Sequence, residues 1–204
     1  MVYPSFEEEK KLWKQGFNNV AGLDEAGRGP LAGPVVAAAV CFAQNFSAKI
    51  LRGIKDSKKL SEKQREKFYK ILTEHPDVKW GAGIVSEKVI DKINILEATK
   101  LAMSAALKDF DHDFLLLDGN FKIYCATPQE SIINGDNKVF SICAAGIIAK
   151  VTRDRLMEKY HKKYPQYGFL QHKGYGTRAH FAALEKFGPC KIHRKTFWPV
   201  SKFV

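Results

Sequence analysis

The chain has 204 residues, of which 45% are hydrophobic and 27% are charged, as is typical of one soluble globular domain. Its 33 lysines and arginines outnumber its 22 aspartates and glutamates and give a formal net charge of +11, which favours a polyanionic partner such as nucleic acid over a surface kept basic for solubility. No apolar stretch approaches the ~18 residues of a membrane span, and the N-terminus lacks the apolar core of a signal peptide.

Apolar runs, capping residues and turn residues predict a mixed α/β domain. In chain order, the predicted elements are a helix over 5–16, strands over 20–23 and Val35–Phe42, a helix over 61–73, a strand over 80–85, a helix from Asn94 past Ala106, strands over 114–117 and near 132–133, a helix over 139–164 and a helix over 177–187. The helix over 139–164 is apolar nearly all round in its first half, so we expect it to cross the middle of the domain.

The first predicted strand leads into acids and glycines. Asp24 and Glu25 end the strand, and the turn Gly27-Arg28-Gly29 follows at once. Carboxylate oxygens bind hard cations, whereas bare glycine backbone and a guanidinium bind phosphate or sugar oxygens. This segment predicts metal-dependent chemistry on a phosphodiester.

Two further acids follow later strands. Asp118 ends the strand over 114–117, and Asp136 lies in a turn after the last predicted strand. One such acid more often caps a turn or pairs with an arginine, but several brought close cannot all ionise without a cation. Mg²⁺ fits such a set because it needs only a few carboxylates besides water and substrate oxygens, and two such ions can promote an in-line displacement.

Two segments carry groups suited to nucleic acid. Residues 171–177 combine cations, glycines and Tyr175 just before a helix, a combination that suits phosphates and stacking on a sugar or base. An ordinary loop with a packing tyrosine explains this segment equally well. Lys58 lies in a basic turn over 56–59, which suits backbone phosphates or is only a solvated charged face.

Several familiar motifs are absent. The glycines from Gly27 to Gly33 are one residue too widely spaced for a dinucleotide-binding G-x-G-x-x-G turn, and no Walker A loop is present. The four cysteines form no C-x-x-C pair, and two of them lie in apolar runs. This usage fits a reducing, cytoplasmic setting.

Taken together, these segments resemble type 2 ribonuclease H, in its bacterial ribonuclease HII branch. The blocks that carry the resemblance are 22–34, 56–60, 94–96, 118–119, 141–154 and 172–177, followed by His193, Arg194, Phe197 and Pro199. The ribonuclease HIII branch departs from the Gly-Arg-Gly turn and carries a long N-terminal substrate domain, which favours the HII branch here. Gly146 stands where the family usually has serine, and we expect a close helix contact to explain it.

The resemblance implies an RNase H-like fold, with a central mixed β-sheet flanked by helices and a C-terminal helical portion that closes over the substrate. It implies a single domain over 1–204, with a catalytic core over about 18–165 and a closing segment over 166–204. The residues that map onto the family's catalytic metal site are Asp24, Glu25, Asp118 and Asp136. Asp154 competes for the fourth place, and we interpret it as an ion-pair partner because the helix there becomes charged and exposed.

The substrate-binding residues implied by the resemblance are Gly27, Arg28, Gly29, Lys58 and Tyr175. The Gly-Arg-Gly turn would recognise the ribose 2′-hydroxyl, the feature that distinguishes RNA from DNA, and Tyr175 would pack on the adjacent deoxyribose. Expected cofactors are Mg²⁺ or Mn²⁺, and expected substrates are RNA–DNA hybrids and duplex DNA containing ribonucleotides. A cytoplasmic monomer without membrane contact is expected, and the C-terminal tail has no clear sliding-clamp motif.

The implied reaction is hydrolysis of the RNA strand, including cleavage 5′ to a single embedded ribonucleotide, which leaves a 3′-hydroxyl and a 5′-phosphate. Two alternatives stay open at this point. One is another two-metal nuclease of the same fold that acts on DNA. The other is a basic nucleic-acid-binding protein without catalytic activity, whose acids are structural.

Overall fold

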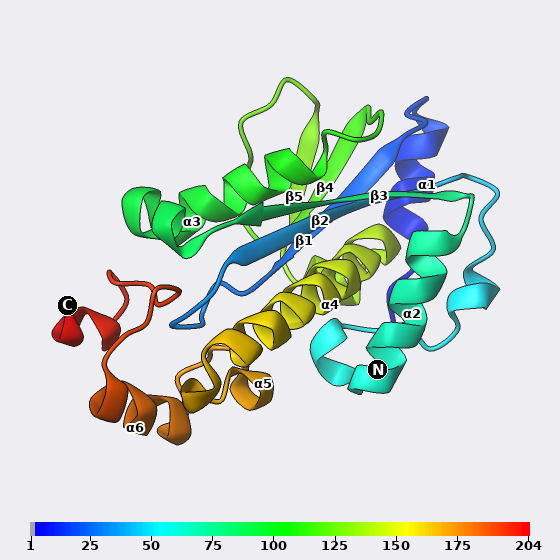
Figure 1. Ribbon diagram of the computed structural model, residues 1–204. Coiled ribbons are helices and arrows are strands. Elements are labelled where there is room, and N and C mark those ends of the chain that lie inside the picture. Colours follow the sequence, from blue (N-terminus) through cyan, green and yellow to red (C-terminus); the bar gives the residue numbers. More distant parts are fainter. Residues whose placement is uncertain (1–2) are drawn as a thin grey trace.

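The computed structural model describes residues 3–204, so the first two residues of the predicted domain lie outside the described part. A five-stranded mixed sheet has helices on both faces (Figure 1). The strands are β1 (Val20–Ala26), β2 (Val35–Phe42), β3 (Val78–Val85), β4 (Phe114–Asp118) and β5 (Gln129–Ile132). The α-helices are α1 (Glu7–Lys14), α2 (Glu62–Glu74), α3 (Glu87–Ala106), α4 (Phe140–Lys163), α5 (Phe169–His172) and α6 (Arg178–Phe187). The predicted fold class is confirmed.

Strand β1 lies at the centre of the sheet, whose strand order is β3-β2-β1-β4-β5. It runs antiparallel to β2 and parallel to β4. Because parallel strands end at the same edge of a sheet, the ends of β1 and β4 meet. Leu23 pairs with Leu117, so Asp24 and Asp118 follow on adjacent strands at the next position. The topology thereby brings together two acids that are far apart in the chain.

The two faces of the sheet are covered by different helices. Alternate residues of β2 point to opposite faces, and all of them are buried. Val36, Ala38 and Val40 join a cluster with the first half of α4, whereas Ala37 and Ala39 join a cluster with α3. Figure 1 shows α4, in yellow, running along the sheet toward the orange C-terminal helices. The predicted buried strand and the central helix are confirmed.

Helix α3 differs most from the sequence prediction. It begins at Glu87, but Asn94 has φ 67° and interrupts the helical backbone. The Asn94 side chain accepts hydrogen bonds from the backbone N–H groups of Leu96 and Glu97, at 2.9 and 3.2 Å. The predicted helix start at Asn94 is therefore correct for the second part of α3 only. The segment over 87–93 was missed because Ser86 before it makes no capping side-chain bond.

Smaller differences affect three element bounds. Helix α1 is shorter than the predicted 5–16, because it begins at Glu7 and ends at Lys14. Strand β3 begins two residues before the predicted position 80, and β5 ends at Ile132 rather than continuing to 133. The bounds of β5 are hard to predict because it is an edge strand with no fully buried residue, so its apolar pattern is weak.

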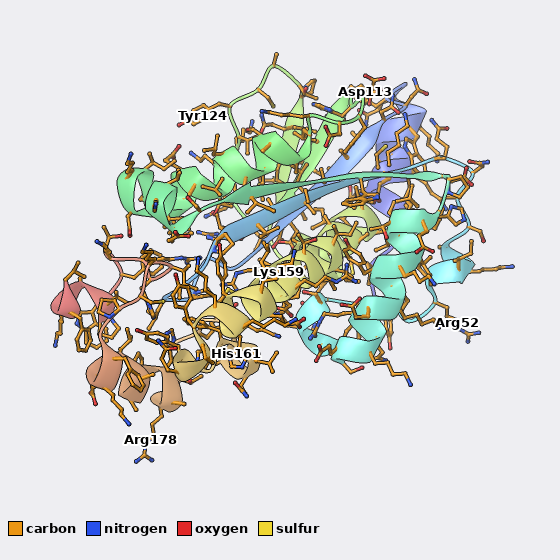
Figure 2. The ribbon with its side chains drawn as sticks, in the orientation of Figure 1. Arg52, Asp113, Tyr124, Lys159, His161 and Arg178 are labelled. Atoms are coloured by element: carbon orange, nitrogen blue, oxygen red, sulfur yellow. The ribbon has the colours of Figure 1, made fainter. Side chains whose placement is uncertain are left out.

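Positive side chains lie over much of the surface. In Figure 2, Arg52 and Arg178 lie far apart, and each side chain points outward from the molecule. Both residues are exposed. None of the helices in residues 3–204 combines the length and the apolar character needed to cross a bilayer. Positive charge spread over separate parts of the surface suits a long polyanion better than one small anion.

Candidate active site

Four acids surround the edge where β1 and β4 end. Asp24 and Glu25 lie near the end of β1, as predicted, and the strand continues one residue further, to Ala26. Asp118 is the last residue of β4, and its Oδ1 accepts a hydrogen bond from the Gly135 N–H at 2.7 Å. That bond joins β4 to the short turn that carries Asp136. All four predicted metal-site acids therefore come from segments in contact with one another.

Burial and neighbouring negative charges raise the pKa of the carboxyls of Asp24, Glu25 and Asp118. Burial contributes most to the raised pKa of Asp24, followed by the charges of Glu25 and Asp118. The pKa of Glu25 is raised by burial although Arg28 opposes the shift, and the pKa of Asp118 is raised by burial and by Asp136. In each case the protein disfavours the charged form. A cation among these acids would remove that penalty.

The oxygen atoms of these acids fit a hard cation. Asp24 Oδ1 accepts from the Glu25 N–H at 2.7 Å, and Asp136 Oδ1 accepts from Asn137 Nδ2 at 2.6 Å. One oxygen of each carboxylate is thereby fixed in direction, while the other is left for a ligand. Glu25 Oε2 is buried without a hydrogen-bond partner, a costly state that a metal ion would relieve.

The acids do not form a closed cage. Within residues 3–204, no three acid, histidine or cysteine side chains converge closely enough to enclose a metal ion by themselves. Mg²⁺ and Mn²⁺ differ from zinc in this respect, because Mg²⁺ keeps several waters and takes part of its coordination from substrate phosphates. An open set of carboxylates suits such an ion.

Gly146 on α4 makes room for Asp24. A Cβ atom at this position would overlap Asp24 Oδ2, so only glycine allows the carboxylate to lie against the helix in this rotamer. The expected close helix contact at Gly146 is therefore present, and its partner is the side chain of Asp24 on β1. The glycine makes room for an acid of the predicted metal site.

A cavity of about 230 Å³ opens beside Asp24 and Glu25. The other residues that line it are Ala26, Gly27, Arg28, Gly29, Ser57, Lys58, Lys150 and Tyr175. The predicted substrate-binding residues thus share one cavity with two of the acids. Burial acts to lower the pKa of the Lys58 ammonium, but the charges of surrounding acids together outweigh it and raise that pKa; these acids are Asp24, Asp56, Asp136 and Asp118.

Lys150 is the residue of this cavity that the sequence prediction missed. It lies one helical turn after Gly146 on α4, and the i, i+4 spacing puts both residues on one helix face. That spacing, read from the glycine beside the acid, is the signal that could have identified it. Burial lowers the pKa of the Lys150 ammonium.

Asp154 is the ion-pair partner of Lys150, with 2.7 Å between Oδ1 and Nζ. The sequence prediction of an ion pair is correct, but its stated reason is wrong. Asp154 is buried, although Arg155 and Lys159 in the same half of α4 are exposed. With one oxygen on Lys150, Asp154 supports a cation of the cavity wall.

Two buried arginines hold the loop that follows β1. Arg153 of α4 donates to the carbonyls of Ala32 and Pro34 at 3.1 and 3.0 Å, and to that of Lys173 at 2.9 Å. Arg194 donates to the carbonyls of Gly27 and Arg28 in the glycine turn, at 2.6 and 2.8 Å, and to that of Gly33 later in the loop, at 3.0 Å. Both side chains lie in the segments that carry the family resemblance, yet the sequence analysis assigns no role to either.

Gly27 is required twice over at its position. Its φ is +99°, and a Cβ atom there would overlap the side chain of Arg153. Gly53 has a similar φ of +88° but no atom within 4 Å of the same position. We therefore expect Gly27→Ala to lower the free energy of unfolding by about 1–3 kcal/mol more than Gly53→Ala. Urea denaturation of both variants measures the difference, and equal losses would contradict the contact with Arg153.

Tyr175 faces the glycine turn across the cavity. Its ring is 44% exposed and would lie 3.8 Å from a Cβ atom at Gly29. The backbone before it is sharply bent, with positive φ at Lys173 and Gly174. The Gly174 carbonyl accepts from the Leu31 N–H at 2.8 Å, which ties the tyrosine segment to the loop after β1.

A chain of buried histidines fixes the Tyr175 carbonyl. The Cys190 N–H donates to His193 Nδ1 at 2.9 Å, so the proton of neutral His193 lies on Nε2. His193 Nε2 is 3.0 Å from His180 Nε2, and His180 Nδ1 is 2.9 Å from the Tyr175 carbonyl. Each neutral imidazole therefore accepts one hydrogen bond and donates the next. No sequence pattern indicates this pair of hydrogen-bonded histidines.

The fold and the acid cluster define a class of enzyme, the type 2 ribonucleases H. The ribonuclease H2 of Pyrococcus horikoshii OT3 matches the fold with a TM-score of 0.73 at 27% identity, covering 91% of this chain and 96% of that one. The RNase HII of Archaeoglobus fulgidus, solved in a complex with PCNA, matches with a TM-score of 0.75 at 24% identity over 88% and 95% of the two chains. Bst-RNase HIII in complex with Mn²⁺ shares the fold with a TM-score of 0.71 at 20% identity over 90% and 68%.

Sequence relatives narrow this class to one family. The family described as Ribonuclease HII matches residues 21–200, and the chain belongs to that family. The ribonuclease HII of Chlamydia muridarum is 54% identical over 96% of this chain and 89% of its own length. That of Ruminiclostridium cellulolyticum is 52% identical over 96% and 75%. The chain is accordingly a ribonuclease H, an enzyme that acts on RNA–DNA substrates.

Proposed function

We propose that this ribonuclease H cleaves the phosphodiester on the 5′ side of a single ribonucleotide embedded in duplex DNA, as well as the RNA strand of longer hybrids, and leaves a 3′-hydroxyl and a 5′-phosphate. One observation carries the proposal: acids suited to a divalent cation share a cavity with a glycine turn whose backbone is held from behind. The residues proposed to cleave the phosphodiester and those proposed to recognise ribose are thereby adjacent.

Each group has a role that follows from its chemistry. Asp24, Glu25, Asp118 and Asp136 would hold one or two Mg²⁺ or Mn²⁺ ions, which when bound would activate water and neutralise charge on the leaving oxygen. Gly27, Arg28 and Gly29 contact the 2′-hydroxyl, and Tyr175 packs on the neighbouring deoxyribose. Lys58, in the turn over 57–59, and Lys150, on α4, both line the cavity and bind the flanking phosphates of the substrate.

The decisive assay uses two labelled DNA duplexes that differ by one 2′-hydroxyl. In Mg²⁺ we expect one cut, 5′ to the ribonucleotide, and no cut in the all-DNA duplex or in either duplex with EDTA. Equal cleavage of both duplexes would identify a DNA nuclease of the same fold. Binding of both without any cleavage would identify a nucleic-acid-binding protein without catalytic activity.

The remaining expectations concern the setting of the enzyme. Four free cysteines and a basic surface are consistent with a monomer that works on nucleic acid in the reducing cytoplasm. Sequence-independent phosphate contacts make binding depend steeply on salt, so the assays need one fixed ionic strength.

A further inference from the structure

Arg194 is a fully buried cation without an acidic partner. Its side chain is 0% exposed, and in residues 3–204 it forms no ion pair. All three of its hydrogen bonds go to backbone carbonyls, those of Gly33, Arg28 and Gly27, at 3.0, 2.8 and 2.6 Å. A buried charge is costly even when it is hydrogen-bonded. Its retention here calls for a role beyond filling space.

The two bonds to Gly27 and Arg28 fix how the turn presents its backbone. In a trans peptide the C=O and the following N–H point in opposite directions, and both peptide bonds of Gly27-Arg28-Gly29 are trans. Because Arg194 draws the Gly27 carbonyl toward itself, the N–H of Arg28 points the other way. Arg194 also bonds the Arg28 carbonyl, so the N–H of Gly29 likewise points away from Arg194.

The two N–H groups aimed in this way have no acceptor of their own. Among residues 3–204, neither the Arg28 N–H nor the Gly29 N–H donates a hydrogen bond. Both residues line the cavity beside Asp24 and Glu25. The turn therefore offers two adjacent backbone donors to whatever enters that cavity, while the carbonyls of Gly27 and Arg28 are engaged behind it.

We propose that Arg194 is a positioning residue for ribose recognition, because it turns the N–H groups of Arg28 and Gly29 toward the oxygen of the substrate's 2′-hydroxyl. This inference rests on the proposed function and assigns the source of its selectivity. A deoxyribose has no oxygen at that point, so both donors would lose water without a replacement. The turn thus selects ribose by leaving its donors unpaired when the hydroxyl is missing.

Equilibrium binding without divalent metal tests this role apart from catalysis. Fluorescence anisotropy in EDTA compares two DNA duplexes that differ by one 2′-hydroxyl, at fixed salt. We expect the wild-type protein to prefer the ribonucleotide duplex, and Arg194→Lys to lose at least tenfold of its affinity for that duplex. Lysine keeps the charge but cannot form the planar fork that binds several carbonyls. Affinity for the all-DNA duplex is expected to stay unchanged.

A matched control separates positioning from general loss of stability. Leu72 is a buried core residue of α2, and Leu72→Ala opens a cavity away from the turn. We expect Leu72→Ala to lower the melting temperature and to keep the full preference for the ribonucleotide duplex. If Arg194→Lys, at a matched folded fraction, keeps that preference as well, Arg194 has only a structural role.

NMR of the wild-type protein gives a second test, which holds even if the variant fails to fold. On addition of the ribonucleotide duplex in EDTA, we expect the amide ¹H signals of Arg28 and Gly29 to move downfield, with little change on addition of all-DNA duplex. The carbonyl ¹³C signals of Gly27 and Arg28 are expected to stay in place. Movement of those carbonyl signals instead would mean that the turn binds ribose through its acceptors, which overturns the proposal. Failure of the cleavage assay in Mg²⁺ would leave both binding results interpretable.

Discussion

Replacing Asp24 with asparagine is expected to lower cleavage of the ribonucleotide duplex by at least ~10³-fold, because losing one metal-binding carboxylate removes several kcal/mol of transition-state stabilisation. The same change is expected to leave the melting temperature unchanged or to raise it. The pKa of Asp24 is raised by burial and neighbouring acids, so its charged form costs stability when no cation is present. Cleavage rates in Mg²⁺ and thermal melts in EDTA measure the two effects.

A pair of variants checks which acid completes the metal site. Asp136→Asn removes a proposed metal ligand, whereas Asp154→Asn removes only the partner of Lys150. We expect the loss of cleavage to be much larger for Asp136→Asn and to be partly reversed by higher metal concentration. The opposite order would assign the fourth place to Asp154.

Acidification from pH 6.5 to 4 is expected to destabilise the protein through its buried histidines. Burial lowers the pKa of His180 and His193 from 6.5 to about 4. Above pH 6.5 the two histidines are neutral in both the folded and the unfolded protein, so they do not change the free energy of unfolding with pH. As the pH falls toward 4, the unfolded chain binds protons that the folded chain refuses, so the free energy of unfolding decreases. One imidazole taken alone accounts for about 3 kcal/mol.

Comparison with a double variant isolates this effect from the carboxyls, whose raised pKa values act in the opposite direction. In His180→Asn with His193→Gln, each amide can replace the donor N–H of the imidazole it substitutes without titrating. We expect urea denaturation to show a smaller loss of stability between pH 6.5 and 4 in this variant. An unchanged pH dependence would mean that the histidines become protonated without disturbing the Tyr175 segment.

Much of the fold follows from local patterns. The predicted helix over 61–73 begins with a capping box, in which the Ser61 and Gln64 side chains are each bonded to the other's backbone. The apolar run of β2 is buried on both faces. Such elements are predictable because the residues that define them are neighbours in the chain. The four acids were found for a related reason, since each lies next to a strand or turn with a recognisable pattern.

The rest of the site depends on contacts between distant segments. Gly146 was noticed only as a departure from a pattern, and its contact with Asp24 needed the packing of α4 on β1. Arg153 and Arg194 look like surface residues in the sequence, because arginine is seldom buried. Their acceptors are backbone carbonyls, which no side-chain pattern identifies. The histidine chain was likewise hidden, since its order depends on how the C-terminal segment folds back.

The hydrogen bonds of Arg194 also set an order of events during synthesis. The residues that would hold the metal lie between positions 24 and 136, whereas the side chain that bonds the Gly27 carbonyl comes 167 positions later. A ribosome adds residues from the N-terminus, so the acids and the glycine turn leave it well before Arg194 does. A chain cut short before Arg194 would keep every proposed metal ligand and lose the group that orients the turn. If Arg194 has the proposed role, a nascent chain would acquire its preference for ribose only after residue 194 has been added and has packed against the turn.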